Sequence, residues 1–282
     1  MKFSLVLATV DRTDEVRRFF DSLDTQTHKN FELIVVDQNP DDKIISLLER
    51  HRDNFSFVHI HEPDRRGVSR ARNLGLQKVT GDVVSFPDDD CWYPPELLKT
   101  VADFMKSHPE VDSVSGRMVH EHEETGNGPD TQGYFLETPL KIAQIPGPWS
   151  LFLRGPEVQK AGMFDETLGP GAGTPWGSGE DTDYYLRVYE AGFNFFYHPD
   201  VAVYHPIASQ YFADGSDLGR SYRYGAGRTR VWKRRHLPLW YFAYEVARSG
   251  GGTALSLLQG QKNKAAWHWG AFRGKIRGWF SR

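Results

Sequence analysis

The stretch Ser85-Phe86-Pro87-Asp88-Asp89-Asp90-Cys91-Trp92 places three consecutive carboxylates directly after a short apolar run. That run begins at Asp82, contains β-branched residues and follows Thr80-Gly81, so it predicts a buried strand that ends in a loop. Ligands bind at the carboxyl ends of the strands in open α/β sheets. Carboxylates clustered at that edge predict a site for Mg²⁺ or Mn²⁺ with a phosphate-bearing ligand, because these ions prefer hard oxygen ligands. The competing interpretation is a solvated turn whose acids cap a helix.

Apolar runs alternate with helical spacings on both sides of this stretch. The expected strands are residues 2–9, 31–36, 55–60, 82–86, 111–119, 149–153, 194–198 and 201–205. One expected helix begins at Thr13, and the others span residues 41–51, 67–79, 94–107 and 180–191. This order predicts an α/β domain with a mainly parallel sheet flanked by helices, extending over residues 1–215. Two further segments are expected to be loops, namely the polar residues 120–133 and the glycine- and proline-rich residues 169–179, the latter a lid or a binding loop.

Charge divides the chain into two parts. The net charge is −3, but residues 216–282 hold 14 Lys and Arg against two acids, a net +12 that leaves −15 for the first 215 residues. We therefore expect a basic helical extension, 216–282, that meets an anionic surface.

Cysteine content and hydropathy predict a cytoplasmic location. Cys91 is the single cysteine, so no internal disulfide forms and the chain suits a reducing compartment. The apolar run near the amino terminus, residues 3–10, is too short for a signal sequence. No run reaches the roughly 18 apolar residues of a spanning helix.

Five segments in order resemble the family-2 glycosyltransferases of the GT-A fold, which use nucleotide-sugar donors and invert the anomeric centre. The resemblance spans roughly residues 3–205. The matching segments are Ala8-Thr9-Val10-Asp11-Arg12, Ile34-Val35-Val36-Asp37, Arg66-Gly67-Val68-Ser69-Arg70-Ala71-Arg72-Asn73, Asp88-Asp89-Asp90 and Gly179-Glu180-Asp181.

The resemblance assigns most of these segments to the donor. It implies that Asp90 coordinates the metal directly and that Asp88 belongs to the ribose or metal shell. Asp37 would accept a hydrogen bond from the base, as in uridine-nucleotide relatives, or else be an Asx-turn acid. Arg66 or Arg72 would counter a phosphate charge. The other residues expected at the nucleotide are Thr9, Asp11, Arg12 and Asp89.

The Glu-Asp segment carries the expected catalyst. Inverting transfer requires a base that removes the proton of the acceptor hydroxyl, and the resemblance names Asp181 as that base with Glu180 in support. The alternative is that Ser178-Gly179-Glu180-Asp181 is a capping box.

Two aromatic side chains complete the expected site. Trp176 would stack on an acceptor sugar or simply pack. His205 would bind the metal or the diphosphate, preferably manganese, or be a hydrogen-bonded residue at a strand end.

The basic extension combines arginines with tryptophan and phenylalanine, a composition typical of a helix that lies in a membrane interface. Packing of these aromatics on the catalytic domain is the alternative, and Arg228 or Arg230 could reach the donor diphosphate. The Gln-x-x-Arg-Trp motif of processive synthases is absent, so we expect a single addition per acceptor.

The sequence thus predicts a metal-dependent inverting glycosyltransferase that adds one sugar, from a UDP-sugar by preference, to a glycan or lipid-linked glycan of a cell-surface polysaccharide. It would work in the cytoplasm or at the inner face of the membrane. A nucleotidyltransferase is the second hypothesis, although residues 9–14 lack its glycine-rich loop. A catalytically inactive domain that binds sugars or nucleic acid is the third, and nucleic acid is the less favoured partner.

Overall fold

The computed structural model describes residues 1–120, 132–206 and 218–281. Its centre is an eight-stranded sheet in the order β3-β2-β1-β4-β7-β5-β8-β6. The strands are β1 (Phe3–Thr9), β2 (Phe31–Asp37), β3 (Ser56–His61), β4 (Val83–Ser85), β5 (Ser113–Val119), β6 (Tyr134–Phe135), β7 (Leu151–Arg154) and β8 (Phe195–Tyr204). The pairs β1/β2, β2/β3, β1/β4 and β5/β8 are parallel, whereas β7 runs antiparallel between β4 and β5. The predicted mixed, mainly parallel sheet is confirmed.

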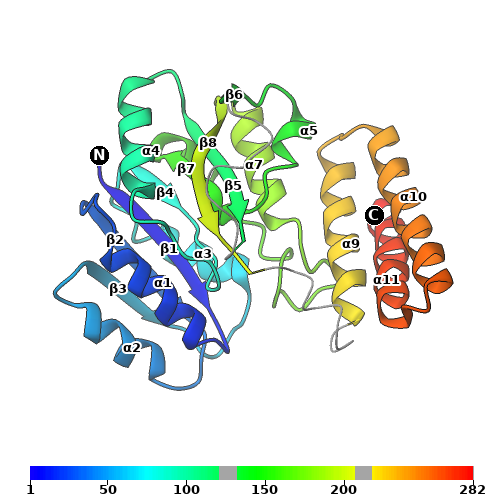
Figure 1. Ribbon diagram of the computed structural model, residues 1–282, viewed down its shortest axis with the longest axis horizontal. Coiled ribbons are helices and arrows are strands. Elements are labelled where there is room, and N and C mark those ends of the chain that lie inside the picture. The colour runs from blue at the N-terminus through cyan, green and yellow to red at the C-terminus, as the bar shows by residue number, and fades with distance from the viewer. Residues whose placement is uncertain (121–131, 207–217, 282) are drawn as a thin grey trace.

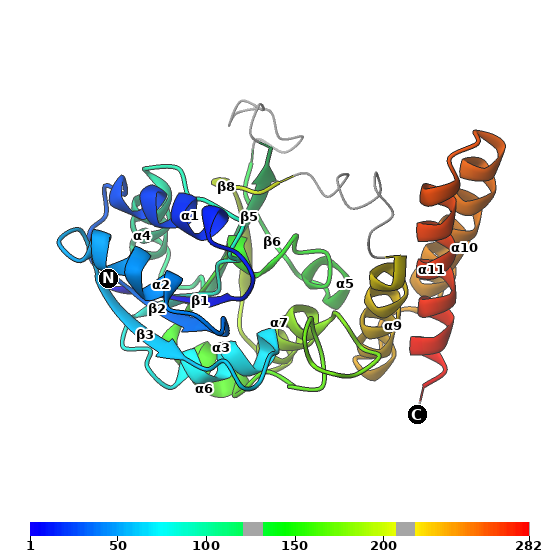
Figure 2. The same ribbon diagram turned by 90° about the horizontal axis from the view of Figure 1, so that it is seen from below.

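Helices cover both faces of the sheet (Figures 1 and 2). They are α1 (Asp14–Asp24), α2 (Lys43–Leu48), α3 (Val68–Leu76), α4 (Leu97–Ser107), α5 (Pro139–Ile142), α6 (Gly155–Ala161) and α7 (Glu180–Glu190), with the 3₁₀ turns η1 (Glu49–His51) and η2 (Pro148–Ser150). Residues that alternate along one strand enter opposite cores: Leu5 and Leu7 pack with α1 and α4, and Val6 packs with α6 and α7. The strands are therefore buried on both faces, as their apolar runs predict.

Two expected strands form one continuous element. Residues 194–198 and 201–205 were expected to be separate strands, yet β8 runs through both and through Pro199-Asp200 between them. The irregularity is absorbed by a register shift between Ser115 and Arg117 of β5. Gly116 permits it, since a Cβ there would lie 1.8 Å from Val201 O.

Three helices follow the sheet domain: α9 (Leu218–Arg234), α10 (Leu239–Leu258) and α11 (Lys262–Trp279). They form a bundle at one side of the molecule, in which α9 lies next to the sheet domain and α10 and α11 lie beyond it (Figures 1 and 2). Within the described ranges, no helix has both the length and the apolar content needed to cross a membrane. The predicted boundary at 215/216 and most of the predicted loop 120–133 lie outside the described residues.

Candidate active site

Three predicted metal ligands converge at the carboxyl edge of the sheet. Asp88 and Asp90 lie in the loop after β4, and His205 directly follows β8; one ligand atom of each lies within 4.8 Å of the others. His205 Nε2 is 3.2 Å from Asp90 Oδ1, and the Trp149 ring packs against the imidazole with 5.3 Å between centroids. Carboxylate oxygens with one imidazole nitrogen suit Mn²⁺ better than Mg²⁺. The residues present therefore fit the predicted metal.

The middle acid of the triplet contacts the segment after β1. Asp89 accepts hydrogen bonds from Thr9 Oγ1 at 3.0 Å and from Arg12 Nη1 at 2.7 Å. Arg12 Nη1 also lies 2.6 Å from Asp90 Oδ2. The first matching segment is thus joined directly to the acidic loop, and Arg12 brings a positive charge to it.

Arg72 of α3 connects the metal group to the expected base. Its side chain is 3% exposed and donates from Nη1 to Asp181 Oδ1 at 2.5 Å and from Nη2 to Asp88 Oδ1 at 3.1 Å, with Glu180 Oε1 at 3.8 Å. Arg66, in contrast, forms an exposed ion pair with Asp11 at 2.7 Å. The arginine expected to counter a phosphate charge is therefore held among three carboxylates.

No capping box forms at the start of α7. The N-cap residue is Gly179 at φ 95° and it makes no side-chain cap bond, while Ser178 Oγ donates to Tyr224 O of α9 at 2.7 Å. Asp181 points instead to Arg72. The interpretation of this segment as a local helix cap therefore does not account for Asp181.

Asp37, at the end of β2, is fully buried. Its Oδ1 accepts from Asn39 N and Nδ2 at 2.9 and 2.8 Å, and its Oδ2 lies 3.1 Å from His59 Nε2. The Asx turn that the sequence offered as an alternative is thus present, together with a histidine from β3.

The glycine-rich segment 169–179 is packed between α3 and α9. Val68 N donates to Pro170 O at 3.0 Å, and Gly177 N donates to Arg223 O at 3.2 Å. Within this segment, the Arg230 guanidinium carbon lies over the Trp176 ring, 4.6 Å from the ring centroid. The residue expected at the acceptor therefore also contacts α9, which brings the C-terminal helices to the edge of the site.

Comparison with known proteins identifies the family of this chain. The family described as "Glycosyl transferase family 2" matches residues 4–158, more than half of the chain. The chain belongs to glycosyl transferase family 2. Its curated relatives include the glycosyltransferase AglE of Haloferax volcanii, which is 22% identical over 84% of this chain and 76% of that protein. Other curated relatives are matched over less than half of their own length.

Solved structures show the same fold. TarS 1–349 of Staphylococcus aureus in complex with UDP-GlcNAc matches with a TM-score of 0.61 and 18% identity, covering 98% of this chain and 92% of that one. A mannosyltransferase of Pyrobaculum calidifontis in complex with GDP-Man and Mn²⁺ matches with a TM-score of 0.65 and 14% identity, covering 99% and 87%. The GT-A fold is therefore confirmed for this family-2 glycosyltransferase.

Burial governs the acidity of the site in this family-2 glycosyltransferase. It raises the pKa of Asp88 to about 7 and that of Asp89 to about 6, against the opposing charges of Arg72 and Arg12. It also raises the pKa of Glu180 to about 8, with the Asp181 charge adding to the effect. For Asp90, burial is outweighed by the His205 hydrogen bond and the Arg12 charge, which leave its pKa lowered. Near neutral pH Glu180 is therefore largely protonated, whereas Asp90 keeps its negative charge beside His205 and Arg12.

Cys91 directly follows the acidic triplet, and its side chain lies in the core. The thiol is fully buried and donates to Asp88 O at 3.1 Å. Burial first, and then the charges of Asp88 and Asp90, raise the pKa of this thiol well above its usual value. The side chain therefore packs as a small apolar group.

Sequence reasoning did not anticipate His59 or Asp183. In the β2/β3 pairing, Val35 lies opposite His59 and Asp37 lies opposite His61. Side chains two residues apart on a strand share a face, so this register could have placed His59 beside Asp37. Asp183, 1% exposed, receives Arg187, Arg234 and Arg235 at 2.7 to 3.1 Å. Because Arg234 and Arg235 lie at the end of α9 and directly after it, no local pattern marks this acid.

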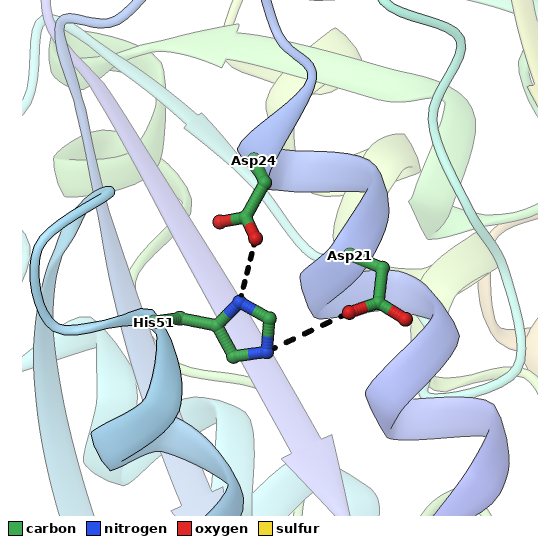
Figure 3. Close-up of side chains that lie close together, drawn as sticks. All are labelled: Asp21, Asp24 and His51. Atoms are coloured by element: carbon green, nitrogen blue, oxygen red, sulfur yellow. Dashed lines mark hydrogen bonds and ion pairs between the residues drawn. The ribbon is translucent and has the colours of Figure 1, made fainter.

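Asp21, Asp24 and His51 form a second acid–histidine group away from the active site (Figure 3). His51 Nδ1 lies 2.8 Å from Asp24 Oδ2, and Nε2 lies 3.7 Å from Asp21 Oδ1. Both ring nitrogens thus face a carboxylate, and the ring stacks on Phe55 with 5.7 Å between centroids. These contacts join α1 to η1.

Proposed function

We propose that this protein is a metal-dependent inverting glycosyltransferase that moves one sugar from a nucleoside-diphosphate sugar, by preference a UDP-sugar, to a glycan or lipid-linked glycan. The proposal rests on two groups of side chains, a set of metal ligands and a carboxylate base, that an arginine joins at one edge of the sheet. Asp88, Asp90 and His205 supply a donor set for a divalent cation, and Arg72 connects that set to Asp181.

In this proposal the two groups have separate roles. A cation bound by Asp88, Asp90 and His205 would neutralise charge on the departing diphosphate. Asp181 takes the proton of the acceptor hydroxyl as that oxygen bonds to the anomeric carbon and the bond to the diphosphate breaks. Arg72 keeps the carboxylate in place, and burial, opposed by Arg72, raises the pKa of Asp181 and makes it a stronger base.

The donor is tested by calorimetric titration with UDP, GDP, dTDP and CDP, each with manganese and then with EDTA. We expect one nucleotide, UDP by preference, to bind only with the metal, because Asp37 stands at the strand end that would receive a base. Binding that EDTA does not weaken would contradict metal dependence.

Two variants separate binding from chemistry. Asp90→Ala is expected to abolish the metal-dependent part of nucleotide binding. Asp181→Asn is expected to keep binding while the transfer rate falls by roughly 10²–10⁴-fold, the usual contribution of a general base. Asp103→Asn, at an exposed position of α4, is the control and should change neither. Full transfer by Asp181→Asn would exclude it as the base.

A further inference from the structure

Helix α10 presents its apolar face to the outside. Trp240 is 63% exposed, Tyr244 57%, Leu255 56% and Leu258 87%. At 3.6 residues per turn these side chains form one stripe along the helix, and the exposed small residues between them lie on the same stripe. Those small residues are Ala247, Gly251 and Ala254.

The opposite face of α10, which packs on α11, is mostly polar. Its buried residues are Glu245, Ser249 and Ser256 together with one aromatic residue, Phe242. Lys275 of α11 is 5% exposed and donates from Nζ to Glu245 Oε2 at 2.8 Å and to Ser249 Oγ at 2.9 Å. Helices on the surface of globular proteins have the reverse arrangement, with the apolar stripe towards the core. The buried Glu245–Lys275 pair thus fixes α10 with its apolar stripe outward.

The charge of the residues around this apolar stripe indicates which kind of partner covers it. Residues 218–281 contain 13 Lys and Arg and a single acid, Glu245, which is buried. Exposed lysines Lys262 and Lys264 lie in the first turn of α11, a short loop after α10, and Arg273 and Arg277 are exposed further along α11. A second copy docked on the same face would bring two strongly basic bundles together. An anionic lipid surface takes up an apolar, aromatic stripe and attracts the basic residues around it.

We propose that the outer face of α10 lies in the interface of an anionic membrane. Trp240, Tyr244, Leu255 and Leu258 enter the headgroup boundary, and Lys262 and Lys264 contact lipid phosphates. This places the contact on α10. On the flanking helices, Trp232 is 2% exposed and Trp279 stacks on Phe242 at 4.2 Å, while Trp269 is 49% exposed and stacks on Phe272 at 5.2 Å. The proposal is independent of the donor, the metal and the catalytic base.

The test is flotation of the full chain with vesicles of phosphatidylcholine alone or mixed with phosphatidylglycerol. We expect the protein to float with the mixed vesicles and to remain in solution with the neutral ones. Trp240→Glu and Leu258→Glu should each weaken binding by roughly tenfold or more, because each removes a large apolar side chain from the interface. Lys264→Glu should weaken it by roughly fivefold or more, since one basic residue contributes about 1 kcal/mol near such a surface.

The matched control is Met163→Glu, which alters an apolar side chain that is 50% exposed on the sheet domain. This variant should float like the original protein. Equal flotation of the Trp240→Glu and original proteins would overturn the proposal, as would failure of the original protein to bind the mixed vesicles. If sedimentation equilibrium instead gives a dimer that Trp240→Glu dissociates, a second copy covers the stripe. Nucleotide titration of the same samples reports separately on the proposed function.

Discussion

At the scale of single residues, Glu157 of α6 stands out because its carboxyl group is buried away from the active site. It is 1% exposed, and Oε2 has no hydrogen-bond partner among the described residues. Burial, reinforced by the Asp112 charge and opposed by Arg154, raises the pKa of Glu157 to about 8. Tyr184 of α7 also faces this carboxyl. The folded protein therefore holds Glu157 protonated near neutral pH.

This burial predicts a pH-dependent stability. Between about pH 4.5 and 8 the unfolded chain ionises Glu157 while the folded chain does not, so the folded state binds the extra proton and the free energy of unfolding falls as pH rises. Glu157→Gln removes this loss and should be more stable relative to the original protein at pH 8 than at pH 5, by on the order of 2 kcal/mol. Urea unfolding at both pH values measures the difference. Glu137→Gln, at an exposed position, should show none, and an identical pH trend in Glu157→Gln would refute the assignment.

Residues of the candidate active site differ in how far the sequence predicts their positions. Asp88 and Asp90 were predictable because an apolar run followed by acids is a local pattern at a strand end. His205 lay at the end of an apolar run and was equally visible. The hydrogen bond from Arg72 to Asp181 joins residues 109 positions apart. Such a contact depends on how α3 packs beside α7, which no local pattern encodes.

At the scale of elements, α9 and α11 approach each other through glycines. A Cβ at Gly274 would lie 2.1 Å from Tyr222 O, and one at Gly278 would lie 2.0 Å from Ala226 O. The two glycines are four residues apart on one face of α11, an arrangement that lets helix backbones come into direct contact. The close packing of α9 and α11 therefore depends on having no Cβ at Gly274 and Gly278.

Two glycine variants test this packing. Gly278→Ala should destabilise the protein by about 1–3 kcal/mol, since the added methyl forces the helices apart. Gly251→Ala is the control: a Cβ there meets nothing within 4 Å, and alanine should stabilise the α10 interior by about 1 kcal/mol. Denaturant unfolding measures both. If Gly278→Ala proved as harmless as Gly251→Ala, the helices would separate without cost.

The element order could be predicted more fully than the element contacts. Alternating apolar runs indicated most strands and the helices between them. The joining of two expected strands into β8 was missed because Gly116, on the neighbouring strand, accommodates the irregularity. The sequence left open whether the aromatics of the C-terminal helices face outward or pack on the catalytic domain, because the orientation of α10 depends on the Glu245–Lys275 pair between two helices.

At the scale of the whole molecule, Asp183 attaches the C-terminal bundle to the sheet domain. Its buried carboxylate accepts from Arg234, the last residue of α9, at 2.7 Å and from Arg235, directly after that helix, at 2.8 Å. Gly177 and Ser178 add backbone and hydroxyl bonds to the same helix. The bundle is therefore held next to the segment that leads into Glu180 and Asp181.

Removing this charge should loosen the attachment. Asp183→Asn leaves the arginines without their buried partner, and loss of one member of a buried ion pair costs about 3–5 kcal/mol. Asp103→Asn, which breaks the exposed Lys99 pair on α4, should leave the free energy of unfolding nearly unchanged, because exposed ion pairs contribute little. Urea unfolding compares the two. Equal small losses would mean that apolar packing alone holds α9 in place.

The buried thiol of Cys91 gives this protein a practical property for spectroscopy. It is the sole cysteine of the chain, and its sulfur is fully shielded in the folded state. A cysteine introduced on the surface would therefore be the one group open to maleimide dyes or nitroxide spin labels, with no need to replace the native residue. Probes placed in this way along α10 could measure its depth in a lipid layer directly.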